Sequence, residues 1–187
     1  KTTGTPISLL VRNQDQRSRD YGEIASCYRP GHADYTFQNK YGFRDYRGGG
    51  RTSGRETIGR VAAGAVASAL LKTLGIKLTA FSKSIGPVTV PESEYRLDEV
   101  TENPLYMPNN GLAKKAADYL NEMMEQKDSC GGIIECRVTG LPVGLGEPVF
   151  DKLDAQLSKG IMSIGAVKAV EIGDGFLAAA SNGSTNN

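Results

Sequence analysis

The sequence contains no tryptophan, one histidine and three cysteines in 187 residues. Cys27, Cys130 and Cys136 are odd in number and lack CxxC spacing, which argues against a disulfide framework or a zinc site. We therefore expect a cytoplasmic protein without a metal centre. No apolar run approaches the length of a membrane span, and no secretory signal is visible. The hydrophobic content of 39% is ordinary for a soluble globular protein.

The net charge of +1 hides an asymmetry along the chain. Residues 1–60 carry eleven Lys and Arg against six Asp and Glu, and nine of the eleven arginines lie there. The planar guanidinium group matches phosphate and carboxylate, so this bias indicates an anionic partner. The alternative is a solvated surface with ordinary ion pairs.

The hydrophobic pattern predicts a mixture of helices and strands. Helices are expected over residues 53–76, 111–128 and 147–161, and strands over residues 5–13, 76–86, 131–138 and 166–173. The first helix should begin with a capping box made by Ser53 and Glu56, and its small outer residues predict that several of its faces are covered. Alternation predicts that Ile134, Cys136 and Val138 point inward. Because regular βα alternation is absent, the order favours an α+β fold.

A glycine run at 48–50 precedes the start of the first helix, near Gly54. The first N–H groups of a helix lack intrahelical partners and face the positive end of its dipole, so this segment is a candidate phosphate site. The alternative is a tight turn whose Ser53 caps the helix. GxxxxGK[ST] is absent, so a P-loop is not supported. Further positive charge comes from Arg47, Arg51 and Arg55.

His32, the single histidine, lies in the motif RPGHAD, between Arg29 and Asp34. A phosphate dianion bound nearby would favour the protonated imidazole, which could then donate a proton near neutral pH. The alternative is a purely structural histidine. The segment YRGGGR also raises RNA binding, but a near-neutral chain with a single such unit argues against it, and steep salt dependence would be its test.

The segment RPGHADYTFQNKYGFRDYRGGGRTSGRET closely resembles the signature region of chorismate synthases. TTGTPISLL, NQDQRSRDY, GLPVGLGEPVFDKLDAQL and MSIGAVKAVEIGDGF resemble further blocks of that family, in the same order. The resemblance implies an α+β fold with antiparallel sheets packed around helices, a single core domain over residues 1–187 and a homotetramer. It also implies that N- and C-terminal segments of the family are missing from this chain.

The resemblance implies a lyase of the shikimate pathway of aromatic amino acid biosynthesis. Chorismate synthases eliminate phosphate from 5-enolpyruvylshikimate 3-phosphate by a 1,4-anti elimination. They require reduced FMN although there is no net redox change, and NADPH serves to reduce the flavin in some members. No nucleic acid or membrane partner is implied. The alternative is an incomplete core that binds flavin or phosphate without turnover.

The resemblance also assigns residues. His32 matches a general acid that also contacts the substrate, and Arg29 and Arg55 match arginines that bind the anionic substrate. The residues that match FMN contacts are Arg51, Thr52, Ser53, Gly54, Gly165 and Ala166. Asp34, Lys40 and Arg47 lie within the signature and are expected to be structural or to support the residues that contact the ligands. Where the family usually reads RSSAR, this chain reads RTSGR, which keeps a hydroxyl and a small residue.

Overall fold

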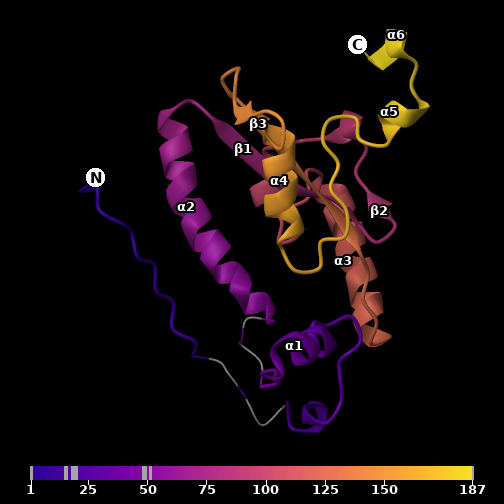
Figure 1. Cartoon of the computed structure of the whole chain (residues 1–187). Helices are drawn as coiled ribbons and strands as arrows, with labels where there is room; N and C mark the ends of the chain where they lie inside the picture. The colour runs from indigo at the N-terminus through magenta and orange to yellow at the C-terminus, as the bar shows by residue number, and fades with distance from the viewer. Residues whose placement is uncertain (1, 15–16, 18–20, 48–49, 51, 187) are drawn as a thin grey trace. The chain divides into compact units, whose positions relative to one another are not determined.

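The computed structural model describes residues 2–14, 17, 21–47, 50 and 52–186. The chain divides into two compact units, residues 68–141 and residues 1–67 with 142–187 (Figure 1). Helices and antiparallel sheets are both present, so the predicted α+β class is confirmed. Among the described residues, none of the helices is long and apolar enough to cross a bilayer. The expectation of one domain over residues 1–187 stays a prediction.

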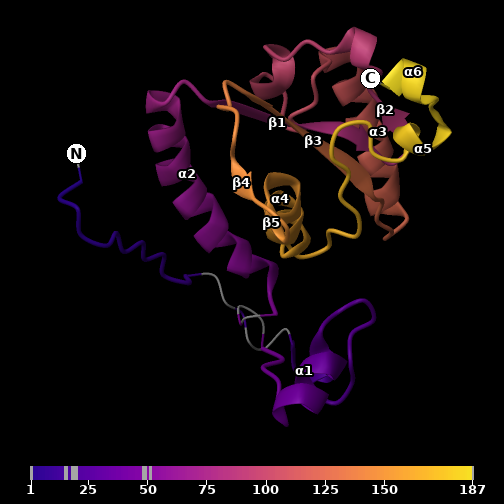
Figure 2. The same cartoon turned by 45° about the horizontal axis from the view of Figure 1, so that its top comes forward.

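The unit 68–141 is built on a three-stranded antiparallel sheet in the order β2-β1-β3. The strands are β1 (Lys77–Ile85), β2 (Val88–Thr89) and β3 (Gly132–Thr139), and the helix is α3 (Asn110–Glu125). β1 and β3 run side by side in both cartoon views (Figure 2), and their register shifts between Ser82 and Ser84. The predictions of these two strands and of this helix are confirmed. The Asn109 side chain caps α3 by accepting a hydrogen bond from the Leu112 N–H.

The core of this unit lies between the sheet, α3 and the irregular segment 90–109. Its buried members are Val90, Met107, Ala113 and Ala116. Phe81 of β1 is 2% exposed, and its ring meets that of Tyr95 edge to face, with 5.0 Å between centroids. Segment 90–109 contains two short 3-10 turns, Glu92–Glu94 and Glu99–Thr101. This segment, which has no strand and only these short turns, therefore contributes to the core.

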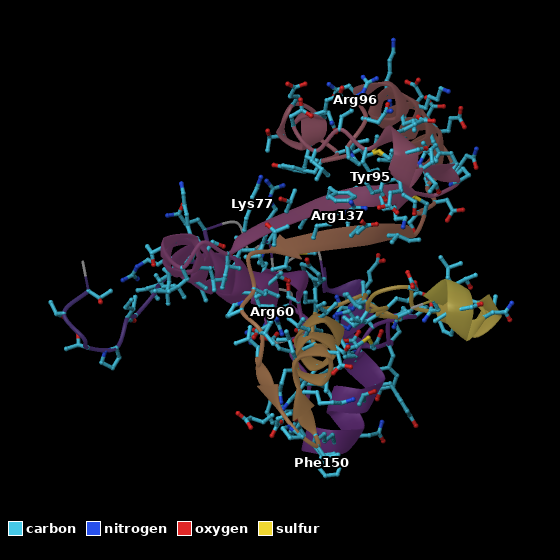
Figure 3. The ribbon with its side chains drawn as sticks, turned by 90° about the horizontal axis from the view of Figure 1, so that it is seen from above. Arg60, Lys77, Tyr95, Arg96, Arg137 and Phe150 are labelled. Carbon is cyan, nitrogen blue, oxygen red and sulfur yellow. The ribbon has the colours of Figure 1, made fainter. Side chains whose placement is uncertain are left out.

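The prediction for the faces of β3 is wrong. Ile134, Cys136 and Val138 are exposed, whereas Glu135 and Arg137 are half-buried. Arg137 lies over the Tyr95 ring, 4.9 Å from its centroid (Figure 3), and bonds Glu135 and Glu92. The charged face is therefore the one that the irregular segment covers, because Tyr95 and Glu92 belong to that segment.

Glu135 is the centre of this polar network. It accepts hydrogen bonds from the Tyr95 hydroxyl (3.0 Å) and the Arg137 Nε (2.8 Å), and Lys83 Nζ lies 3.1 Å away. Burial acts to raise the pKa of Glu135, but the hydrogen bonds from its three neighbours together outweigh that effect and lower it. The network therefore keeps a half-buried carboxylate charged.

The other unit contains α1 (Asp34–Tyr41), the 3-10 turns η2 (Glu23–Ala25) and η3 (Gly54–Glu56), and most of α2 (Thr57–Thr73). After residue 141 it continues with the hairpin β4 (Gly146–Glu147) and β5 (Asp151–Lys152), then α4 (Leu153–Met162), α5 (Leu177–Ala180) and α6 (Gly183–Asn186). Helix α1 lies in a segment for which the sequence predicted neither helix nor strand. Its sequence DYTFQNKY has no apolar stripe, so periodicity did not indicate it.

Three further expectations for this unit are wrong. Residues 5–13 form no strand, and Ile7, Leu10 and Val11 are exposed. Residues 166–173 also form no strand. The helix expected from 147 begins at Leu153, because Pro148 belongs to the β4–β5 hairpin. Apolar residues in these segments resemble strands in composition, but strand formation needs a partner strand.

Helix α2 confirms the predicted periodic segment but not its burial. It has no buried residue, and Val61 and Leu70 are well exposed. The expectation that several faces are covered is therefore wrong for this structure.

Candidate functional site

The motif RPGH folds into a turn that brings two predicted site residues together. The His32 N–H donates to the Arg29 carbonyl at 3.3 Å, with Pro30 and Gly31 at the centre of the turn. Gly31 has a φ of +67°, which glycine adopts at little cost. Pro30 fixes its own φ near the value that the second position of a turn requires. The local sequence thus places Arg29 and His32 at the two ends of one turn.

Asp34, the first residue of α1, joins these two side chains. Its carboxylate is 1% exposed and accepts two hydrogen bonds from the Arg29 guanidinium, from Nε at 2.8 Å and Nη2 at 2.9 Å. It also accepts the Arg29 backbone N–H at 3.2 Å. His32 Nδ1 lies 3.1 Å from Asp34 Oδ1, a charge contact without hydrogen-bond alignment. Hydrogen bonds from Arg29 outweigh the opposing effect of burial and hold the pKa of the Asp34 carboxyl far below its ordinary range.

Arg44 contacts the same carboxylate, that of Asp34. Its side chain is 7% exposed, and Nη1 lies 3.4 Å from Asp34 Oδ2. Nη2 donates to three backbone carbonyls around η2, those of Ile24 (2.9 Å), Ala25 (2.9 Å) and Cys27 (2.7 Å). The guanidinium also lies 5.1 Å from the centre of the Tyr28 ring. Arg44 therefore fixes the chain before the RPGH turn to the carboxylate inside it.

The second group of predicted residues lies at the start of α2. The Ser53 hydroxyl accepts a hydrogen bond from the Arg55 N–H at 3.3 Å, so Ser53 caps this turn as predicted. In a capping box the donor would be the N–H of Glu56, one residue further along the chain. A single 3-10 turn precedes α2, which begins at Thr57 rather than near Gly54. The Arg55 guanidinium donates to Asn13 Oδ1 at 2.5 Å, which ties segment 2–14 to this turn. Arg51 lies outside the described residues.

An apolar hollow of about 380 Å³ opens beside this turn. Its lining contains four aliphatic side chains together with the Gly54 backbone and Thr57. The aliphatic residues are Val11, Ile58, Val61 and Ala62. Gly54 has open space where a side chain would stand, so a ligand can approach its backbone closely.

The third group, Gly165 and Ala166, follows α4. Arg60 of α2 donates through Nη2 to the carbonyl (3.0 Å) and the hydroxyl (3.1 Å) of Ser163, and thereby ties this turn to the helix (Figure 3). Ala166 has a φ of +69°, a left-handed conformation that costs a non-glycine residue about 1 kcal/mol. Backbone strain of this kind is concentrated at functional sites.

The structure thus assembles the predicted residues into three groups. Arg29 and His32 meet at Asp34, and the described residues Thr52 to Arg55 share one turn. Gly165 and Ala166 are tied to α2 through Ser163. Arg55 bonds Asn13 and belongs to the second group. Sequence reasoning missed the roles of Arg44 and Arg60, whose partners lie 17–20 and 103 positions away. The arginine bias of the first 60 residues was the available signal.

Comparison with known proteins identifies the class to which this fold and these residues belong. The family model described as chorismate synthase matches residues 1–187. A solved structure titled "Crystal Structure of Chorismate Synthase" superposes with a TM-score of 0.74 at 34% sequence identity, covering 82% of this chain and 50% of that chain. The chain therefore belongs to the chorismate synthase family.

Individual relatives are close. The chorismate synthase of Agathobacter rectalis is 62% identical over 187 residues, which cover all of this chain and 51% of the relative. That of Paramagnetospirillum magneticum is 52% identical over 99% of this chain and 52% of its own length. The chain thus spans about half the length of the curated relatives it matches.

Proposed function

We propose that the protein containing this chain is a lyase that eliminates phosphate from 5-enolpyruvylshikimate 3-phosphate to give chorismate. In this 1,4-anti elimination the C3–O bond breaks, phosphate leaves, and a hydrogen is lost from C6. The observation that carries the proposal is the pairing of Arg29 and His32 on one buried carboxylate, in a chain of this family. The family match along the whole chain favours this lyase over a core that binds without turnover.

The charges of the site suit such a substrate, which carries two carboxylates and a phosphate. The Arg29 side chain is 26% exposed although its Nε and Nη2 bind Asp34, so it is not fully enclosed. Arginine binds carboxylate and phosphate oxygens through paired hydrogen bonds. In the proposal Arg29 and Arg55 bind these anionic groups, and His32 donates a proton as phosphate departs.

The cofactor proposed is FMN in its reduced form. The apolar hollow beside Gly54 suits a flat ring system, because its aliphatic walls meet a backbone that a ligand can approach. Thr52, Ser53, Gly54, Gly165 and Ala166 are the described residues that would hold it, and Arg51, which lies outside the described residues, is proposed from the family signature. When bound, the reduced flavin supplies an electron-rich group next to the substrate. In the proposal the residues of the chain bind and orient the substrate and the flavin, and His32 protonates the departing phosphate.

The assay is anaerobic phosphate release from 5-enolpyruvylshikimate 3-phosphate with chemically reduced FMN. Wild type is compared with His32→Ala, Arg55→Ala and the control Arg96→Ala. Arg96 projects from segment 90–109, is 68% exposed and pairs with Glu99 (Figure 3). We expect His32→Ala to lower the rate about 100-fold, as is typical for loss of a general acid, and Arg96→Ala to leave it unchanged.

The same samples are titrated with FMN. Full turnover in His32→Ala would contradict its role as an acid. Flavin binding without phosphate release in the wild type would favour the binding-only core. The oligomeric state proposed from the family, a homotetramer, is measured by analytical ultracentrifugation.

A further inference from the structure

We propose that Asp34 is a positioning residue that orients Arg29 and His32 together and keeps the proton of neutral His32 on Nδ1. When the ring is protonated on both nitrogens, the proton that His32 gives away is the one on Nε2: the Nε2–H bond breaks, its electron pair stays on the ring, and the neutral ring keeps its proton on Nδ1. The identity of the proton acceptor rests on the proposed function. The orientation itself rests on the contacts around Asp34.

Both oxygens of the Asp34 carboxylate are in contact with Arg29 or His32. Oδ2 accepts the Arg29 backbone N–H and Nε, and Oδ1 accepts Arg29 Nη2 and faces His32 Nδ1 at 3.1 Å. The carboxylate is 1% exposed, so water does not compete for these positions. One buried group therefore determines the orientation of two side chains that are each about one-quarter exposed.

The surroundings of His32 Nδ1 determine where the proton of the neutral ring lies. Nδ1 is buried and has no aligned hydrogen-bond partner, while a carboxylate oxygen lies 3.1 Å from it. A carboxylate only accepts hydrogen bonds, so a proton on Nδ1 gives an attractive contact and a lone pair there gives a repulsive one. Catalytic hydrogen bonds are often poorly aligned before a ligand binds. The exposed part of the ring excludes Nδ1.

A second aspartate provides a control with the same local geometry. Asp45 accepts the Arg47 backbone N–H (3.1 Å), Nε (3.0 Å) and Nη2 (3.3 Å), the same three donors that Arg29 gives Asp34. The side chain of Asp45 is 42% exposed, and among the described residues its ion pair is with Arg47 rather than with the histidine. The two pairs therefore differ in burial and in contact with His32.

An amide cannot replace the carboxylate of Asp34. In Asp34→Asn, one of the two side-chain positions becomes an NH₂ group, which can donate but not accept. If the amide oxygen faces Arg29 Nε, the NH₂ group faces Arg29 Nη2 and His32 Nδ1. Nδ1 must then act as an acceptor, and the proton of the neutral ring moves to Nε2.

The test is nitrogen NMR of the chain labelled with ¹⁵N-histidine, read from the neutral form of the imidazole. Because the chain has one histidine, every imidazole signal belongs to His32. Wild type, Asp34→Asn and Asp45→Asn are compared without flavin or substrate. The readout is which ring nitrogen carries the proton, and amide dispersion reports folding.

We expect the proton on Nδ1 in the wild type and in Asp45→Asn, and predominantly on Nε2 in Asp34→Asn. A wild-type ring protonated on Nε2 would overturn the proposal, and this spectrum decides even if Asp34→Asn fails to fold. An Nδ1 proton retained in folded Asp34→Asn would overturn it as well. Failure of phosphate release would count against the proposed function and leave this measurement untouched.

Discussion

Arg44→Lys should loosen the segment that carries Arg29 and His32 while the rest of the fold persists. Arg44 Nη2 donates to the carbonyls of Ile24, Ala25 and Cys27. Because this nitrogen has two hydrogens, the three contacts are equivalent in strength to about two hydrogen bonds. Hydrogen bonds to charged groups contribute about 1.5–3 kcal/mol each, and lysine, which lacks the planar fork, recovers part of this. A net loss of about 3 kcal/mol corresponds to a roughly 100-fold larger population of the locally open state.

Hydrogen exchange measures this opening residue by residue. The amides of Phe37 and Gly42, which bond within α1 and at its end, should exchange about 100-fold faster in Arg44→Lys. Those of Ser82 and Val90, in the unit 68–141, should keep their rates. Arg47→Lys, at an exposed arginine of the same segment, is the control. An increase of less than about fivefold at Phe37, under about 1 kcal/mol, would refute the reasoning.

Two further predictions concern stability, measured by urea unfolding followed through tyrosine fluorescence because the chain lacks tryptophan. Phe81→Ala removes a ring that is 2% exposed and should cost about 3–5 kcal/mol, whereas Phe150→Ala, at an 88% exposed ring (Figure 3), should change stability by less than about 0.5 kcal/mol. Equal losses would contradict the assigned core. The pKa of Asp34 is lower in the folded chain than in the unfolded one, so its stabilisation is present above about pH 4 and is lost on acidification. Asp34→Asn should therefore flatten the acid dependence, and an unchanged slope would contradict this.

The elements that sequence reasoning predicted are those whose pattern is local. α2 and α3 repeat apolar residues at helical spacing, and the β1–β3 pair carries the β-branched and alternating residues of strands. α1 was missed because its polar sequence has no apolar periodicity. Its end is marked only by a local signal, the left-handed Gly42 that caps it. The face of β3 was predicted wrongly because alternation separates two faces without saying which one another segment will cover.

The site residues that could be predicted are likewise those whose signal is local in sequence. Arg29 and His32 could be predicted because the RPGH turn and the family signature are contiguous in sequence. The burial of Asp34 could not be predicted, because it depends on Arg44 and on carbonyls 17–20 positions from that arginine. Arg60 and Ser163 meet across 103 positions, which no local pattern encodes. Contacts that close over long separations are visible only once the chain is folded.

The excess of arginine in the first 60 residues allowed two interpretations, an anionic ligand or ordinary surface ion pairs, and the two aspartate pairs separate them. Asp45 and Arg47 form a one-to-one pair on an exposed surface, where the charges cancel. Among the residues that the structure describes, Asp34 pairs with both Arg29 and Arg44, so one negative charge faces two positive charges there, whether or not His32 is protonated. Arg44 is buried and Arg29 is partly exposed, so the uncompensated charge is available on the side that carries His32. A positive charge held in place by a buried carboxylate costs little further ordering when an anion arrives, and this favours the interpretation with an anionic ligand.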